Sequence, residues 1–157
     1  MVQVSISPGG VPNRAIEAGQ VTSKGIAGDG WRHLAFHGTS KRAILLMTSE
    51  GIDELVARGF PVFYGALGEN ITTQRLDRRS LRIGQRFQAG EAVIELTEVR
   101  VPCDTLRVYG AGLRAVIFDA RAQAWDPTSE RWGMSGFYAS VTQPRIVRPG
   151  DPIALVP

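Results

Sequence analysis

Cys103, the single cysteine of the chain, carries the side chain best suited to bind a soft metal or to act as a nucleophile. It follows Val99-Arg100-Val101-Pro102, and because Pro102 ends strand pairing we expect the thiol where a strand gives way to a loop. Arg100 is near enough in sequence for its guanidinium to lower the pKa of the thiol. The alternative is an inert buried thiol, the ordinary state of an isolated cysteine.

A second polar segment, residues 37–42, combines His37, Gly38, Lys41 and Arg42 with two hydroxyl side chains. The glycine permits close approach of the backbone, and the two basic side chains supply positive charge. The segment could therefore cradle a phosphate or another anion, although its spacing is not that of a Walker loop. The alternative is a solvated turn that carries a surface histidine.

A third polar segment places Glu69 and Asn70 directly after Gly68, at the expected start of a strand. A carboxylate acceptor beside a primary amide is suited to hydrogen-bond a heterocyclic ligand. The alternative is a turn whose asparagine begins the strand.

Two histidines four residues apart, His33 and His37, could ligate a metal with Asp29 if they lay on a helix. The glycines in and around this segment disfavour a helix, and the HExxH pattern is absent. We therefore do not expect a zinc site there.

Residues 74–86 hold five arginines and one aspartate, a local charge of +4 that could bind nucleic acid. No aromatic residue lies among these arginines, and the whole chain carries only +3. A solvated loop or an edge strand is favoured over a nucleic-acid surface, which would bind with a steep salt dependence.

The length of 157 residues predicts a single domain over residues 1–157. No signal peptide and no long apolar stretch is visible, so we expect a cytoplasmic protein with no membrane partner. Eighteen glycines and nine prolines punctuate short apolar runs, which indicates a mainly β fold with a few short helices and a closed or partly closed β-barrel.

The elements that must position the polar segments follow from the apolar patterns. Strands are predicted at residues 2–6, 42–47, 136–142 and 153–156, and a hairpin at 86–96 that turns near Gly90. One helix should begin at an N-cap Ser49 and stop at Gly59. A second helix should cover residues 113–120, where apolar side chains recur at i, i+3, i+4 and i+7.

Fragments of this chain, taken in order, resemble the MOSC domain, which forms the C-terminal domain of molybdenum cofactor sulfurases and also occurs as small stand-alone bacterial proteins. The resemblance runs roughly from Gly28 to Asp151. The fragments that carry it are Gly28-Asp29, His37-Gly38 with Arg42-Ala43, Gly68-Glu69-Asn70-Ile71-Thr72, Ile83-Gly84, Arg100-Val101-Pro102-Cys103 and Gly136-Phe137-Tyr138.

The resemblance implies a MOSC-type β-barrel that binds the molybdenum cofactor, a pterin dithiolene (molybdopterin) that ends in a phosphate. It implies that Cys103 is the protein ligand to molybdenum and that Arg42 and Lys41 lie near the phosphate. His37, Gly38, Glu69, Asn70 and Arg100 are then expected to contact the cofactor or the substrate.

These expectations combine into one hypothesis, a molybdenum-dependent oxidoreductase that reduces small N-hydroxylated substrates. One cysteine cannot hold an iron–sulfur cluster and no dinucleotide fingerprint is present, so electrons must come from a separate reductase. The alternative is a non-catalytic carrier of molybdenum cofactor, or of sulfur as a persulfide on Cys103.

Overall fold

The computed structural model describes residues 1–30 and 39–157. Eleven strands and five helical segments are formed within them. The strands are β1 (Gln3–Ile6), β2 (Arg14–Ile16), β3 (Gly19–Thr22), β4 (Gly25–Ile26), β5 (Ile44–Thr48), β6 (Ile71–Thr73), β7 (Arg86–Ala89), β8 (Ala92–Val99), β9 (Phe137–Gln143), β10 (Ile146–Val147) and β11 (Ile153–Val156). The helices are α1 (Ser49–Ala57), α2 (Leu113–Ile117) and α3 (Ala120–Gln123), with 3₁₀ segments η1 (Ser40–Arg42) and η2 (Asp104–Tyr109).

Most of the strands of the described residues form one eight-stranded sheet in the order β11-β7-β8-β9-β5-β6-β1-β2. Its pairs are antiparallel except β5 with β6, which run parallel. Strands β10, β3 and β4 form a smaller sheet. The mainly β prediction is thus confirmed, whereas the ladders of the described residues do not close into a barrel.

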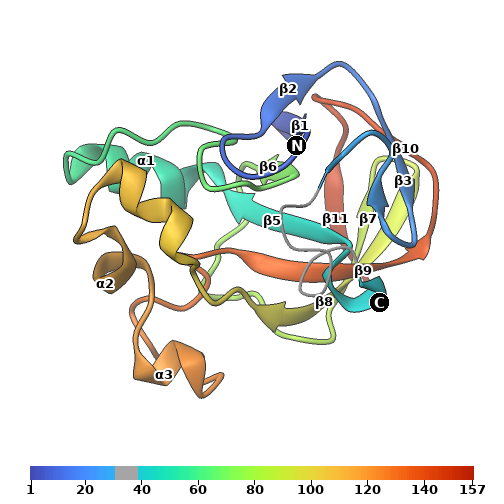
Figure 1. The fold of residues 1–157 in the computed structure, drawn as a ribbon. Helices are drawn as coiled ribbons and strands as arrows, with labels where there is room; N and C mark the ends of the chain where they lie inside the picture. The colour runs from blue at the N-terminus through green and yellow to red at the C-terminus, as the bar shows by residue number, and fades with distance from the viewer. Residues whose placement is uncertain (31–38) are drawn as a thin grey trace.

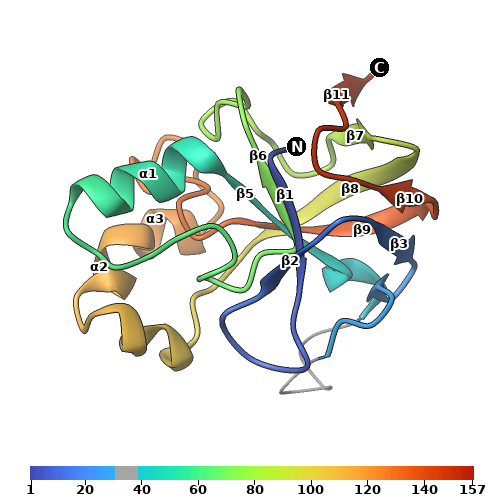
Figure 2. The same ribbon diagram turned by 90° about the horizontal axis from the view of Figure 1, so that it is seen from above.

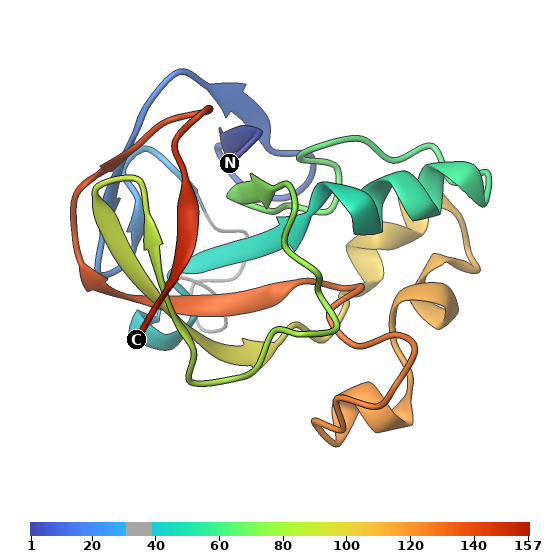
Figure 3. The same cartoon turned by 180° about the vertical axis from the view of Figure 1, so that it is seen from behind.

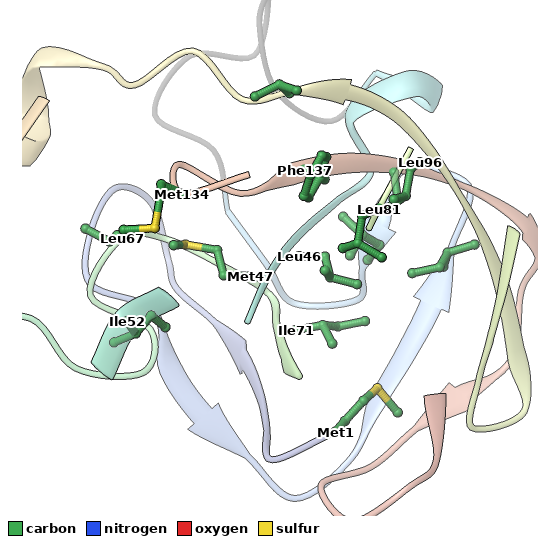
Figure 4. Close-up of a cluster of buried hydrophobic side chains, with 14 of the residues drawn as sticks. Met1, Leu46, Met47, Ile52, Leu67, Ile71, Leu81, Leu96, Met134 and Phe137 are labelled. Carbon is green, nitrogen blue, oxygen red and sulfur yellow. The ribbon is translucent and has the colours of Figure 1, made fainter. Parts of the chain in front are cut away.

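The N-terminus contacts the turn that precedes β11. The ammonium group of Met1 donates to the carbonyl oxygen of Asp151 at 2.5 Å, and the backbone N–H of Gly150 donates to Met1 at 2.8 Å. The side chain of Met1 belongs to the buried core cluster (Figure 4).

The core is one cluster of buried side chains to which both sheets and all three α-helices contribute. Leu46 on β5, Ile71 on β6, Leu96 on β8 and Phe137 on β9 are each almost fully buried and belong to one cluster (Figure 4). All five residues of β5 are buried, as expected of a central strand that is covered on both faces. This rigid centre carries the segments that surround the site.

The three α-helices gather at one end of the large sheet, and β3 and β10 lie at the other (Figures 1 and 2). The same division is visible from behind (Figure 3). Within residues 1–30 and 39–157, no helix combines the length and apolarity needed to cross a bilayer.

The N-cap of helix α1 lies one residue earlier than the sequence predicts. Thr48, not Ser49, is the N-cap, because its Oγ1 accepts from the backbone N–H of Gly51 at 3.2 Å. The C-terminal end is as expected, since Gly59 adopts a φ of 89° after the last turn. The strand predicted from residue 42 begins at Ile44, because Ser40–Arg42 form η1.

The prediction of one continuous helix over residues 113–120 is wrong. Phe118 is extended, and Asp119 starts a new helix by accepting from the backbone N–H of Ala122 at 2.7 Å. The regular apolar spacing of residues 113–120 therefore spans two short helices, α2 and α3. The hairpin β7–β8 is confirmed, with Gly90 at the turn in a left-handed conformation.

Candidate functional site

A pocket of about 330 Å³ lies where the segment after β8, the start of β5 and the loop before β6 come together with residues 10–13 and 29–30. Its wall includes Cys103 and Arg100, which follow β8, and Arg42, which precedes β5. Asn70 before β6 and Asp29 from the N-terminal part complete the polar lining considered below. Its size is within the range of small-molecule sites.

Cys103 ends the extended segment after β8 and directly precedes η2. The residue is exposed, and its Sγ lies 2.7 Å from Oγ1 of Thr105 and 3.9 Å from Nη2 of Arg100. Partial burial of the sulfur raises the pKa of the thiol, but the Thr105 hydrogen bond and the Arg100 charge lower it by more. The pKa of Cys103 therefore lies below its ordinary value, so the thiolate is favoured.

Arg100 is buried, at 4% exposure, and is anchored through its backbone. Its N–H donates to Gly136 at 2.9 Å, and its carbonyl oxygen accepts from Oγ of Ser135 at 2.6 Å. Nη1 of the guanidinium is buried and finds no acceptor among the described residues. Buried donors of this kind are rare in folded proteins, so Arg100 offers a charged hydrogen-bond donor to a ligand in the pocket.

Arg42 lines the pocket, and its guanidinium is held by Glu98 on β8. Nε and Nη2 donate to the two carboxylate oxygens at 2.6 and 2.9 Å, and the guanidinium carbon lies 5.4 Å from the ring centroid of Tyr138. The hydrogen bonds to Glu98 raise the pKa of Arg42 above its ordinary value. A ligand phosphate would therefore have to share Arg42 with Glu98.

Lys41, the other basic residue of the predicted anion cradle, does not line the pocket. Lys41 is exposed, and its carbonyl oxygen accepts from Oγ1 of Thr97 at 2.6 Å. His37 and Gly38 lie outside the described residues, as does His33 of the weighed metal site. Among residues 1–30 and 39–157, no group of three or more His, Cys, Asp or Glu side chains could hold a metal ion.

Glu69 is fully buried and is not part of the pocket wall. Its Oε1 accepts from the backbone N–H of Gly65 at 2.5 Å and from Oγ1 of Thr72 at 3.4 Å, whereas Oε2 has no partner among the described residues. Burial raises the pKa of Glu69, and the charge of Arg100 opposes part of that rise. The carboxylate of Glu69 is thus buried within the protein and does not line the pocket.

Asn70 does line the pocket, but both atoms of its amide bond to the protein. Oδ1 accepts from the backbone N–H of Leu45 at 3.0 Å, and Nδ2 donates to Oδ2 of Asp29 at 2.7 Å and to Ser5 at 3.3 Å. The side chain therefore ties β5 to the segment after β1 and fixes the carboxylate of Asp29.

Asp29 lines the pocket with a carboxylate held on both oxygens. Oδ1 accepts from the backbone N–H of Ser7 at 2.8 Å, and Oδ2 accepts from Asn70. Burial raises the pKa of Asp29, while the N–H donors of Ser7, Asn70 and Gly30 lower it in part. Sequence reasoning weighed Asp29 as a metal ligand with two histidines and counted it in the Gly28-Asp29 fragment of the resemblance, but it assigned Asp29 no contact with the ligand.

Thr105, Tyr138 and Glu98 are further members of the site that sequence reasoning did not assign. Thr105 lies two residues beyond Cys103, and a hydroxyl at that spacing at the start of a helical turn could have signalled the contact with sulfur. Tyr138 lies in the Gly136-Phe137-Tyr138 fragment of the resemblance. Nothing local in the sequence points to Glu98.

The arginines of residues 74–86 are mostly committed to the protein itself. Arg78 is buried and donates from Nη1 to the carbonyl oxygens of Glu130 and Trp132, at 3.0 and 2.6 Å. Arg82 donates to the carbonyl oxygen of Leu81 at 2.9 Å, and Arg86 pairs with Glu95 at 2.9 Å. Residues 74–85 form no strand, as expected of a loop, but β7, which begins at Arg86, lies between β11 and β8 and is not an edge strand.

Several proteins of known sequence or structure are similar to this chain. It is 28% identical over 132 residues to the uncharacterized protein YflK of Bacillus subtilis (strain 168), a match over 82% of this chain and 54% of YflK. The chain thus spans about half the length of the curated relative it matches. YiiM from Geobacillus stearothermophilus superposes with a TM-score of 0.72 at 24% identity, over 99% of this chain and 74% of that one.

The YUAD protein from Bacillus subtilis superposes with a TM-score of 0.69 at 21% identity, over 97% of this chain and 92% of that one. These structural likenesses show a shared fold. The sequence model of the MOSC domain matches residues 33–154, which include the Gly68-Glu69-Asn70 and Arg100-Val101-Pro102-Cys103 segments of the pocket region. The chain therefore belongs to the MOSC domain family, which is associated with molybdenum cofactor binding.

Proposed function

We propose that this chain binds the molybdenum cofactor in the pocket, with Cys103 as the protein ligand to molybdenum, and that the loaded protein reduces N-hydroxylated substrates. The observation that carries the proposal is the position of Cys103 on the pocket wall beside Arg100, whose Nη1 has no acceptor among the described residues. The metal-binding sulfur of Cys103 and a buried cationic hydrogen-bond donor are therefore available to the same bound molecule.

The thiolate donor at Cys103 fits a metal that prefers sulfur ligands. A thiolate is the form that ligates metal, and the Arg100 charge with the Thr105 hydrogen bond favours it. Cys103 is exposed, so the sulfur is accessible to a ligand that enters the pocket. The Thr105 hydroxyl, 2.7 Å from Sγ, restricts the direction of the side chain.

The cofactor also requires space for a flat heterocycle, which glycine residues provide where they line the pocket. Gly10, Gly30 and Gly68 line the pocket without side chains, next to the apolar Val11 and Leu67. A Cβ at Gly30 would clash with the carbonyl oxygen of Pro8, so this part of the wall is kept as glycine. The volume of about 330 Å³ suits a ligand of this kind.

The fit at the phosphate is supported by Arg42 and not by Lys41. Arg42 lines the pocket, and a guanidinium is the side chain best shaped to bind phosphate oxygens. Glu98 holds that guanidinium in place and competes for its N–H groups. Lys41 would have to act through its long side chain from an exposed position.

The bound cofactor would supply a metal that accepts an oxygen atom and cycles by two electrons. The balanced reaction converts an N–OH group, two electrons and two protons into N–H and water. Within this reaction the thiolate of Cys103 holds the metal, and Nη1 of Arg100 donates to an electronegative atom of cofactor or substrate. The electrons are proposed to come from a separate reductase.

The test of this function is turnover of the holoprotein, isolated from cells that make the cofactor. A chemically reduced viologen dye replaces the reductase, and an N-hydroxylated amidine is the substrate. We expect one amidine formed for every two electrons consumed, with loss of turnover in Cys103→Ser. A loaded wild-type protein that forms no amidine would contradict the catalytic part of the proposal.

Exposure of the Cys103 thiol also supports a second candidate, a carrier of sulfur or of cofactor. A persulfide on Cys103 would add the mass of one sulfur atom, removable by a thiol reductant. Protein that holds cofactor or persulfide tightly and transfers it to a client enzyme without turnover would favour the carrier.

A further inference from the structure

The pocket contains a carboxylate whose hydrogen-bonding capacity is only partly used within the described residues. Asp29 accepts one N–H from Ser7 on Oδ1 and one from Asn70 on Oδ2. The backbone N–H of Gly30, which also lowers the pKa of Asp29, donates to the carbonyl oxygen of Ser7 at 2.6 Å. A carboxylate has about four acceptor sites. Each oxygen of Asp29 thus keeps capacity for a further donor, and the residue lines the pocket.

The groups that hold Asp29 are neutral and come from fixed parts of the fold. Ser7 contributes a backbone N–H directly after β1, and Asn70 is itself fixed by the backbone N–H of Leu45 on β5. Burial raises the pKa of Asp29, and no charged side chain is among the causes of that shift. The two oxygens therefore form an oriented acceptor pair rather than half of an ion pair.

The other carboxylates near the pocket are less suited to this task. Glu69 is fully buried and lies behind the wall. Asp104 lines the pocket, but its side chain is 79% exposed and lies 3.8 Å from the guanidinium of Arg107. Asp29 is thus the pocket carboxylate that the protein holds on both oxygens.

We infer that Asp29 recognises the heterocycle of the bound ligand by accepting two adjacent N–H groups of a 2-amino-4-oxopyrimidine ring, with Asn70 as the residue that positions it. This inference rests on the proposed function and names the ring of the cofactor to which Asp29 would hydrogen-bond. A pterin presents an amino N–H and a ring N–H side by side, and the two oxygens of one carboxylate match that pair. Asn70 acts through Asp29, because its own amide is bonded to protein.

This assignment changes the expectation drawn from sequence, in which Glu69 and Asn70 contacted the heterocycle directly. It also predicts selectivity. Lumazine, the pteridine with oxygen in place of the 2-amino group, presents a carbonyl acceptor where the pterin presents a donor. An unpaired acceptor facing a fixed carboxylate is unfavourable, so the pocket should discriminate between the two rings.

The experiment is fluorescence titration of the metal-free protein with free pterin and with lumazine. The proteins are wild type, Asp29→Asn, and Asp104→Asn as a matched control on the same pocket wall. We expect wild type and Asp104→Asn to prefer pterin over lumazine by about tenfold or more. Asp29→Asn should lose that preference, mainly through weaker pterin binding, because an amide offers one acceptor and one donor in place of two acceptors.

A wild-type protein without preference for pterin, or an Asp29→Asn variant that keeps the preference, overturns the inference. The wild-type comparison of the two rings holds even if Asp29→Asn fails to fold, which is checked by its thermal unfolding. The proposed function is judged separately, because it fails when wild type from cofactor-making cells carries no molybdenum, whatever the ring preference.

Discussion

Nη2 of Arg100 lies 3.9 Å from Sγ of Cys103, and Nη1 of the same buried guanidinium has no acceptor among the described residues. One arginine therefore stabilises the thiolate and also offers a donor to whatever the thiolate binds. Its backbone bonds to Ser135 and Gly136 fix it at the end of β8 independently of any ligand. This pair defines the reactive part of the pocket.

Replacing Arg100 with Gln should raise the pKa of the Cys103 thiol. The positive charge that favours the thiolate is removed, while the burial that opposes the thiolate remains. The pH dependence of alkylation by iodoacetamide measures this directly, and its midpoint should move to higher pH. Arg107→Gln, which changes an exposed arginine of η2, is the control and should leave the profile unchanged. An unshifted profile in Arg100→Gln would contradict the assigned role of Arg100.

Glu98→Gln should strengthen the binding of inorganic phosphate, and Arg42→Gln should weaken it. The Glu98 carboxylate occupies Nε and Nη2 of Arg42, so neutralising it leaves the guanidinium more available to an anion. Isothermal titration of the metal-free variants with phosphate measures both effects. Arg86→Gln, which breaks the exposed pair with Glu95, is the matched control. Equal phosphate affinity in wild type, Glu98→Gln and Arg42→Gln would rule out Arg42 as the phosphate contact.

The unfolding free energy should decrease as pH rises above the ordinary Glu value of 4.5, in part because of Glu69. Burial raises its pKa in the folded state, so the folded protein binds this proton more tightly than the unfolded chain does. The resulting stabilisation is complete below the unfolded pKa and is lost as pH rises through the folded pKa. Asp29 contributes with the same sign.

Glu69→Gln should reduce that loss, because a neutral amide carries no proton linkage. Urea unfolding at several pH values from acid to neutral measures the slope for the variant and for wild type. Identical slopes in the two proteins would mean that Glu69 titrates normally in the folded state.

Thr48→Ala should lower the unfolding free energy by about 1 kcal/mol, the usual cost of losing an N-cap. Ser49→Ala should cost less, because the Ser49 hydroxyl bonds to the side chain of Glu50 at 3.2 Å, whereas the capping N–H of Gly51 donates to Thr48. Urea unfolding of the two variants distinguishes the observed cap from the one that the sequence predicts. A larger loss in Ser49→Ala would show that the cap is assigned to the wrong residue.

The sequence predicted those elements whose signals are local. The β7–β8 hairpin follows from alternating apolar residues around Gly90, and the end of α1 follows from Gly59. The break between α2 and α3 was missed because Asp119 caps α3 while also bonding to Ser129 and Arg131, ten or more residues away. The spacing of apolar residues does not indicate that Asp119 bonds to Ser129 and Arg131.

The same distinction applies to the site. Arg100 and Cys103 are three residues apart, so their contact could be predicted from the chain itself. Asp29 and Asn70 are 41 residues apart, and their pairing depends on how β1, β5 and β6 assemble. The polar character of Glu69 and Asn70 was therefore visible in the sequence, whereas the division of their roles, with Glu69 behind the wall, was not.

The measurement that tests the central claim most directly is the molybdenum content of the protein isolated from cells that make the cofactor. Wild type and Cys103→Ser are compared, with pterin fluorescence after oxidative release measured on the same samples. We predict close to one molybdenum per wild-type chain and loss of the metal from a folded Cys103→Ser variant. Equal molybdenum in both proteins, or none in wild type, would contradict the assignment of Cys103 as the metal ligand.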